Sequence, residues 1–344
     1  MIDLKRPIHT GYIESPDFKP YYIRKESVLG KTKGIARRLL KPRSVSKEST
    51  NSKRIAKFDD FNKAIKLSTP YYSIDSLYDN PPLYDVYISG SDQLWNPEQP
   101  FPIEPYFLTF VRNSSSKKIS YASSIGISSL EPLQVRDFTR WLSSYDAISV
   151  REPEAARILQ PHLKQKIEIV ADPTFLLDVN EWNLLAHDYP ERGYILCFML
   201  AFQSVLLTEV LRVSNDLGKK LIVIGQRGIP KNKRYTLIDD AGPREFLGLI
   251  KCADCVFTDS FHGTVFSILL GVKNFFSYVA IGNRRVSRLE TLLSPLGHLD
   301  RIIRNDDFSK VDGLLKEGVD IEKQNAIVRA ESVSSRLFLD RYIK

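Results

Sequence analysis

Short apolar runs alternate with segments of helical periodicity along the chain after residue 80. Apolar or β-branched runs that close on small residues predict strands at 83–90, 118–122, 147–150, 167–170, 194–200, 220–224, 255–258 and 274–279. The segments between them predict helices at 133–145, 152–159, 204–217, 243–252, 263–270 and 286–293, and a long terminal helix at 319–342. Strands that alternate with helices indicate an α/β fold with parallel sheets covered on both faces.

The alternation occurs in two halves that meet near residues 178–192, in a chain of 344 residues. We therefore expect two Rossmann-like domains, 1–180 and 190–320, followed by a C-terminal helix at 321–344. The first 80 residues are irregular and polar, with helices predicted around 35–40 and at 53–67. In open α/β sheets ligands bind beyond the carboxyl ends of the strands, so candidate chemistry is sought there.

Composition narrows the class of protein. With 43% hydrophobic and 26% charged residues and three cysteines, the chain is globular, which excludes a disordered, collagenous or disulfide-scaffold protein. No signal-like N-terminus and no run of 18 apolar residues occurs, so we expect a cytoplasmic protein. Cys252 and Cys255 form a C-x-x-C without a second ligand pair, which favours buried side chains over a metal site.

The net charge of +8 is concentrated in one segment. Residues 23–57 carry twelve basic side chains against Glu26 and Glu48, so this segment has a charge of +10 and the rest of the chain −2. Such a distribution, with few interleaved aromatics, argues against a nucleic-acid partner. Two interpretations stay open, a solvated connecting helix and a peripheral contact with the anionic inner membrane leaflet.

The first strand is followed by Gly90-Ser91-Asp92-Gln93-Leu94-Trp95-Asn96. Small residues let a ligand approach the backbone, and an acid, two amides and an indole suit the hydroxyls and face of a sugar. The alternative is a capping loop, with Asp92 on backbone amides and Trp95 in the core.

Two later strand ends carry charged or titratable groups. Arg151 precedes a helix that opens with Pro153, and the guanidinium there suits an anion, unless it pairs with Glu154 or a neighbouring carboxylate. The segment 258–264, Thr-Asp-Ser-Phe-His-Gly-Thr, joins a short strand to an apolar helix. His262 in this turn can transfer a proton, and Gly263 permits close backbone approach. The alternative is a capping turn in which the histidine bonds a carbonyl.

Five ordered segments together resemble the polysaccharide pyruvyl transferase family. They match, in order, the family's "YDVYIVGSDQVWN", "YAASFG", "SVRE", "xDPT" and "TDSFHG" motifs at residues 84–96, 121–126, 149–152, 171–174 and 258–263.

The resemblance implies a GT-B-like fold and transfer of pyruvate from phosphoenolpyruvate, the donor substrate, to a sugar or lipid-linked oligosaccharide as a ketal. It implies no cofactor and no metal. His262 is implied to act as general acid or base, and Arg151 to hold the donor's carboxylate or phosphate. Substrate contacts are expected from the other motif residues: Ser91, Asp92, Gln93, Trp95, Asn96, Ser123, Ser124, Asp172, Ser260, Gly263 and Thr264.

The sequence departs from the family in two places. Some members carry an arginine two residues before the motif histidine, where this chain has Ser260, so a second anion contact is expected from Arg227, Ser123 or helix amides. Members also begin with a strand and a loop-and-helix unit before the segment that Met1–Leu4 resembles. We expect the first domain to lack that unit. The alternatives to a pyruvyl transferase are a GT-B glycosyltransferase using a nucleotide sugar and a catalytically impaired sugar-binding homologue.

Overall fold

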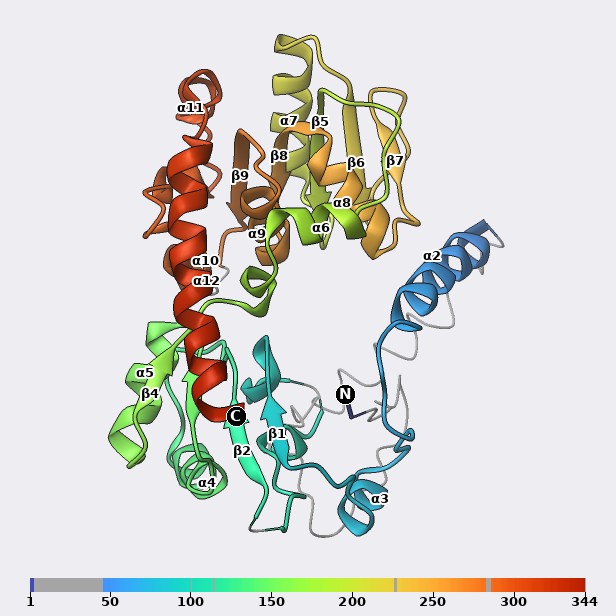
Figure 1. Cartoon of the computed structure of the whole chain (residues 1–344). Helices are drawn as coiled ribbons and strands as arrows, with labels where there is room; N and C mark the ends of the chain where they lie inside the picture. The colour runs from blue at the N-terminus through green and yellow to red at the C-terminus, as the bar shows by residue number, and fades with distance from the viewer. Residues whose placement is uncertain (3–45, 100, 114, 226–227, 283–285, 344) are drawn as a thin grey trace, which may run out of the picture. The chain divides into compact units, whose positions relative to one another are not determined.

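A computed structural model describes residues 1–2, 46–99, 101–113, 115–225, 228–282 and 286–343 (Figure 1). The chain forms two compact units. Unit 1 contains residues 65–172 with both chain ends, and unit 2 contains residues 48–64 and 173–336. The boundary thus falls between Asp172 and Pro173. In contrast to the expected division, the C-terminal helix is shared between the units and the helix before residue 64 belongs to unit 2.

The helices and strands follow the predicted alternation. The helices are α2 (Ser46–Asn62), α3 (Ile74–Asp79), α4 (Pro132–Leu142), α5 (Pro153–Leu159), α6 (Val179–Leu185), α7 (Ser204–Asp216), α8 (Pro243–Lys251), α9 (Phe261–Leu269), α10 (Val286–Leu293), α11 (Val311–Glu317) and α12 (Ile321–Ile343). The strands are β1 (Val86–Ser89), β2 (Lys117–Ser120), β3 (Ile148–Val150), β4 (Ile167–Ile169), β5 (Tyr194–Met199), β6 (Leu221–Gly225), β7 (Thr236–Ile238), β8 (Ala253–Thr258), β9 (Asn274–Val279) and β10 (Ile302–Arg304).

Unit 2 is built on a six-stranded parallel sheet in the order β10-β9-β8-β5-β6-β7. From the centre, β5, β6 and β7 follow one another to one edge, and β8, β9 and β10 to the other. This is the doubly wound Rossmann order, and the sequence order reverses between β5 and β8. All six residues of β5 are buried, because helices cover both faces of the sheet.

The two faces of the unit 2 sheet carry different helices. Leu206 and Val210 of α7 and Val311 of α11 pack with alternate residues of the sheet in one core cluster. On the opposite face, Phe198 of β5 contacts Phe246 of α8 at a ring-centroid distance of 4.9 Å. These contacts bury both sides of each central strand, as the apolar runs of the sequence predicted.

In the part of unit 1 that the structure describes, four parallel strands occur. β1 pairs with β2 and β3 with β4, while single bridges from Ile119 to Ala147 and from Ser123 to Val150 join the two pairs. One core cluster contains residues of α4, α5 and the segment after β1. The last residues of α12 also belong to this unit, where Arg341 forms a salt bridge to Glu168 at 2.9 Å.

The α/β fold class predicted from the sequence is confirmed, with two Rossmann-like units, parallel sheets flanked by helices and a long C-terminal helix. Helix α2 differs from the helix predicted at 53–67, because its first turns are too polar to show an apolar period. The helix predicted at 35–40 lies outside the described residues. No helix among the described residues is long and apolar enough to span a membrane.

Candidate functional site

The strand order of unit 2 reverses between β5 and β8, and in folds of this kind ligands bind at the carboxyl ends of the two strands where the order reverses. Asp259 follows β8 at this point. Its Oδ1 accepts a hydrogen bond of 2.7 Å from the backbone N–H of Leu200, which follows β5. Burial raises the pKa of Asp259, and backbone hydrogen bonds to the carboxylate partly offset that shift. This carboxylate joins the carboxyl ends of β5 and β8.

His262 lies in the first turn of α9, directly beyond Asp259. Ser260 is the N-cap of this helix, and its side chain accepts a hydrogen bond of 3.3 Å from the backbone N–H of Gly263. The His262 side chain is partly exposed, and its ring lies edge-on to Phe261 at 5.4 Å between centroids. The histidine thus lies at the N-terminus of α9, directly after β8, as the sequence predicted for a strand-to-helix turn.

Three neighbours of His262 have structural contacts of their own. Thr264 is fully buried and its hydroxyl lies 2.7 Å from that of Ser277 on β9. A Cβ atom at Gly263 would lie 2.5 Å from Oγ1 of Thr258, so the absence of a side chain lets α9 pack against β8. The hydroxyls of Ser260 and Thr264, which were expected to contact substrate, are thus hydrogen-bonded to Gly263 and to Ser277 on β9.

The motif after β1 contributes mainly to the core of unit 1. The Trp95 indole is 0% exposed, stacks on Phe107 at 4.9 Å and donates a hydrogen bond of 3.1 Å to the Tyr106 carbonyl. Because its faces are covered by protein, the core interpretation applies to Trp95 and the sugar-stacking interpretation does not. Sequence alone left these two readings open.

The side-chain amides of Gln93 and Asn96 pack against Gly126 in the 121–126 motif. Asn96 donates a hydrogen bond of 3.2 Å to Gln93 Oε1, and both residues are buried. A Cβ at Gly126 would lie 2.6 Å from Gln93 Nε2 and 2.9 Å from Asn96 Nδ2. Gly126 has a φ of +71°, and its backbone lies against these two side chains, where a larger residue would collide with them. Gln93 and Asn96 thus fix the loop at 123–126.

That loop carries two buried serines. The Ser123 hydroxyl donates to the Ser89 carbonyl at 3.2 Å, and its backbone bridges β1 and β3 through Asp92 and Val150. The Ser124 hydroxyl donates to Glu152 Oε1 at 2.9 Å. Because both hydroxyls bond protein groups, Ser123 is a poor source for the second anion contact. Arg227, the other side chain considered for it, lies outside the described residues.

Arg151 lies at the centre of a group of carboxylates in unit 1. Its Nη1 donates to Asp172 at 2.6 Å, its Nε to Glu152 at 3.0 Å and its Nη2 to Asp92 at 3.3 Å. Burial lowers the pKa of Arg151, but the charges and hydrogen bonds of Glu152 and Asp172 more than compensate, so its pKa is raised. Glu154, the alternative partner, pairs with Arg157 instead.

The structure therefore brings the predicted site residues together as two sets. Asp92, Ser124, Arg151 and Asp172 meet in unit 1, and Ser260, His262, Gly263 and Thr264 lie together in unit 2. Sequence reasoning missed Glu152 and Asp259 as members. Each is an acidic residue next to a predicted site residue, Glu152 beside Arg151 and Asp259 beside Ser260, and this position within a motif could have identified it.

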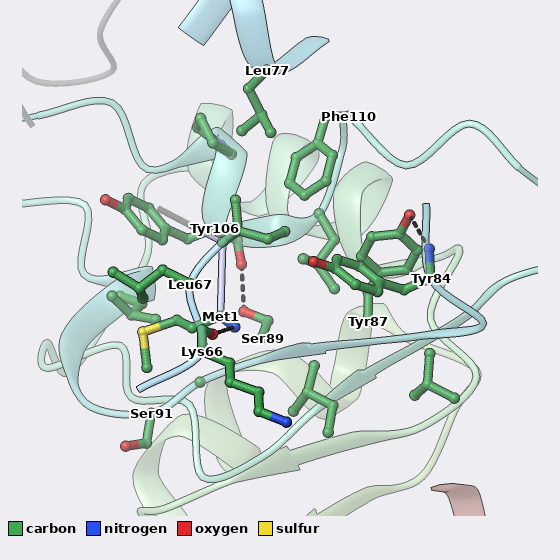
Figure 2. Close-up of a pocket in the computed structure, with 17 residues that line it drawn as sticks. Met1, Lys66, Leu67, Leu77, Tyr84, Tyr87, Ser89, Ser91, Tyr106 and Phe110 are labelled. Atoms are coloured by element: carbon green, nitrogen blue, oxygen red, sulfur yellow. Dashed lines mark hydrogen bonds between the residues drawn. The ribbon is translucent and has the colours of Figure 1, made fainter. Parts of the chain in front are cut away.

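A separate cavity of about 750 Å³ runs beside β1 in unit 1 (Figure 2). Leu67 and Met1 lie toward one end of it, and Tyr84 and Tyr87 toward the other. Its lining is largely apolar and includes Ser91 but none of the charged motif residues. Of the expected substrate contacts, Ser91 lines this cavity, while the next residue, Asp92, bonds Arg151.

The fold and the placement of the motifs define an α/β protein of two Rossmann-like units with polar motif residues at the carboxyl ends of parallel strands. The family model for polysaccharide pyruvyl transferase matches residues 8–278, and the chain belongs to that family of transferases. The suspected family relationship is therefore confirmed. In a comparison with curated proteins, none matches this chain.

Several solved structures align with most of the chain at low identity. A putative UDP-N-acetylglucosamine 2-epimerase from Listeria monocytogenes is 12% identical, with 87% of this chain and 80% of that chain covered and a TM-score of 0.48. UDP-N-acetylglucosamine 2-epimerase from Rickettsia bellii is 11% identical, with 87% and 95% covered and a TM-score of 0.48. UDP-GlcNAc 2-epimerase from Neisseria meningitidis is 10% identical, with 88% and 83% covered and a TM-score of 0.47.

Proposed function

We propose that the protein transfers a pyruvyl group from phosphoenolpyruvate to two hydroxyls of a sugar, forming a ketal in the biosynthesis of a bacterial surface polysaccharide. Membership of the polysaccharide pyruvyl transferase family supports this proposal. The observation that carries it is the position of His262, partly exposed at the start of α9 and at the point where the strand order of unit 2 reverses.

In the proposed reaction His262 acts as general acid and then as general base. It gives a proton to the methylene carbon of phosphoenolpyruvate, which makes C2 oxocarbenium-like. Two sugar hydroxyls add to C2, phosphate leaves, and one of the hydroxyl protons returns to the imidazole. The other proton leaves with phosphate or solvent, so the histidine ends in its starting state. A histidine suits both steps because it can give or take a proton near neutral pH.

Arg151 is proposed to hold the donor's carboxylate or phosphate through its guanidinium. Phosphoenolpyruvate is the donor substrate, and the reaction as proposed uses no cofactor or metal. Asp92 is more than half exposed and can accept a hydrogen bond from an acceptor hydroxyl. The acceptor is a sugar or a lipid-linked oligosaccharide.

We propose a cytoplasmic location, with the basic segment 23–57 contacting the inner membrane leaflet where a lipid-linked acceptor would lie. Among the basic residues of this segment that the structure describes, Lys57 has acidic partners in unit 2. It lies 3.4 Å from Asp240 and 3.5 Å from Glu245, so it holds α2 to the rest of unit 2 rather than facing lipid. Charge reversal at Lys53 and Arg54 should weaken sedimentation with anionic vesicles, and unchanged sedimentation contradicts the contact.

The test is phosphate release from phosphoenolpyruvate in the presence of candidate bacterial glycans. Wild type and His162→Ala, an exposed control, should release phosphate and His262→Ala should not. Failure of wild type to release phosphate with any glycan contradicts the proposal. A thermal shift with nucleoside diphosphates but not phosphoenolpyruvate would indicate the glycosyltransferase alternative. Glycan binding without turnover would indicate an impaired sugar-binding homologue.

A further inference from the structure

Three hydrogen bonds of Arg151 reach carboxylates that follow different strands of unit 1. Asp92 follows β1 and Asp172 follows β4, while Glu152 is adjacent to Arg151 itself after β3. Because parallel strands end at the same edge of a sheet, two distant chain segments add their carboxylates to that of the adjacent Glu152 around one guanidinium. The arrangement of carboxylates around Arg151 therefore depends on tertiary structure.

The partners differ in burial and in distance. The side chains of Glu152 and Asp172 are 5% and 2% exposed, and their contacts with Arg151 are 3.0 and 2.6 Å long. The Asp92 side chain is 56% exposed and its contact is 3.3 Å long. A short, buried charge-assisted hydrogen bond fixes geometry, whereas an exposed ion pair contributes little and exchanges readily.

Glu152 is itself held in place. The hydroxyl of Ser124 donates to the same Oε1 atom that accepts from Arg151 Nε. Glu152 thus links the loop at 123–126 to the guanidinium, and Asp172 fixes the opposite end through Nη1. With Nε and Nη1 occupied by buried partners, Nη2 is the atom that points toward the exposed carboxylate.

We propose that Glu152 and Asp172 are positioning residues that orient Arg151, and that Asp92 is an exchangeable partner which the carboxylate of phosphoenolpyruvate displaces from Nη2. This inference rests on the proposed function. The exchange substitutes one carboxylate for another, so the charge beside the guanidinium is unchanged by the contact. Asp92 moves farther into water, which costs little because it is already more than half exposed.

The two roles predict effects of opposite sign on donor affinity. Asp92→Asn removes a competing charge, so the Kd for phosphoenolpyruvate should fall about two- to fivefold. Asp172→Asn loosens the guanidinium, so the Kd should rise about tenfold, and Asp172→Glu should recover part of that loss. In an Arg151→Gln background Asp92→Asn should leave the Kd unchanged, because the group for which it competes is gone.

The experiment measures phosphoenolpyruvate binding to the full chain by titration calorimetry, with a thermal unfolding curve for each variant. Asp79→Asn, an exposed acid on α3, is the matched control for loss of one negative charge in unit 1 and should leave the Kd unchanged. If Asp79→Asn lowers the Kd as much as Asp92→Asn does, the effect is one of general charge and the inference is overturned.

The remaining outcomes separate the two proposals. Saturable donor binding to wild type with an unchanged or weaker affinity in Asp92→Asn overturns the exchange while leaving the proposed function standing. No saturable binding to wild type, Asp92→Asn or Asp79→Asn overturns the proposed donor and this inference together. Equal donor affinity in Asp172→Asn and wild type, with both folded, shows that Asp172 does not position Arg151.

Discussion

Asp172 Oδ2 lies 2.6 Å from Arg151 Nη1, and both side chains are almost wholly buried. The contact joins the end of β4 to the end of β3. Removal of one partner leaves an uncompensated charge in the interior. We expect Arg151→Met to lower the free energy of unfolding by about 3–5 kcal/mol, since Glu152 and Asp172 then lose their shared cation.

Urea unfolding curves test this loss of stability. Arg157→Met is a suitable control, because Arg157 pairs with Glu154 on the surface of α5 and is well exposed. An exposed pair of that kind should contribute far less than the buried one, because water screens it. Equal losses in the two variants would contradict the buried role of Arg151.

Substitutions of Trp95 test whether it serves as a core residue or stacks on a sugar. Its ring stacks on Phe107 within the unit 1 core, so Trp95→Ala should lower the free energy of unfolding by about 3–5 kcal/mol. Trp95→Phe should retain most of the stability and the acceptor KM of wild type. A large rise in acceptor KM for a stable Trp95→Phe protein would restore the sugar-stacking interpretation.

Two glycines in helices of unit 2 should respond to alanine in opposite directions. At Gly263 the new methyl group would lie 2.5 Å from Thr258 Oγ1 and 3.1 Å from the Phe198 ring, whereas at Gly313 nothing lies within 4 Å. Gly263→Ala should destabilise the protein by about 1–3 kcal/mol through overpacking. Gly313→Ala should stabilise α11 by up to about 1 kcal/mol, because it lowers backbone entropy in the unfolded chain. Paired melting curves give both values.

The contribution of Asp259 to the free energy of unfolding should depend on pH. Burial raises its pKa in the folded state, so its stabilising contribution is greatest below the pKa of the unfolded chain and is lost as pH rises through the folded value. Asp259→Asn retains an oxygen for the Leu200 N–H and removes the buried charge. The variant should therefore be more stable than wild type at pH 7, with the difference vanishing in acid. A constant difference across the pH range would contradict this account.

The three cysteines should report the unfolding of unit 2. Cys197, Cys252 and Cys255 are all buried free thiols in this unit, and burial raises the pKa of Cys197 and Cys255. We expect a thiol reagent to modify them only after opening, at a rate that rises with urea. Fast labelling of the native protein at neutral pH would show that the β5 and β8 core is accessible.

Much of the fold followed from the sequence because buried strands have a strong local signal. The run at 194–200 is apolar throughout and the run at 274–279 is mostly aromatic and apolar, and they match β5 and β9 closely. The edge strands β7 and β10 were missed, since each has three residues and carries partly or fully exposed positions. A short edge strand has too few buried residues to produce a pattern.

The sequence by itself determined the motifs, their order and their placement at strand ends. It also determined the turn that presents His262, because a strand, an N-capping Ser260 and an apolar helix are local features. Only the tertiary structure decided which motif side chains are buried and which partners they take. Arg151 meets residues 59 and 21 positions away because parallel strands end at one edge of the sheet. That juxtaposition depends on strand pairing, which no local pattern specifies.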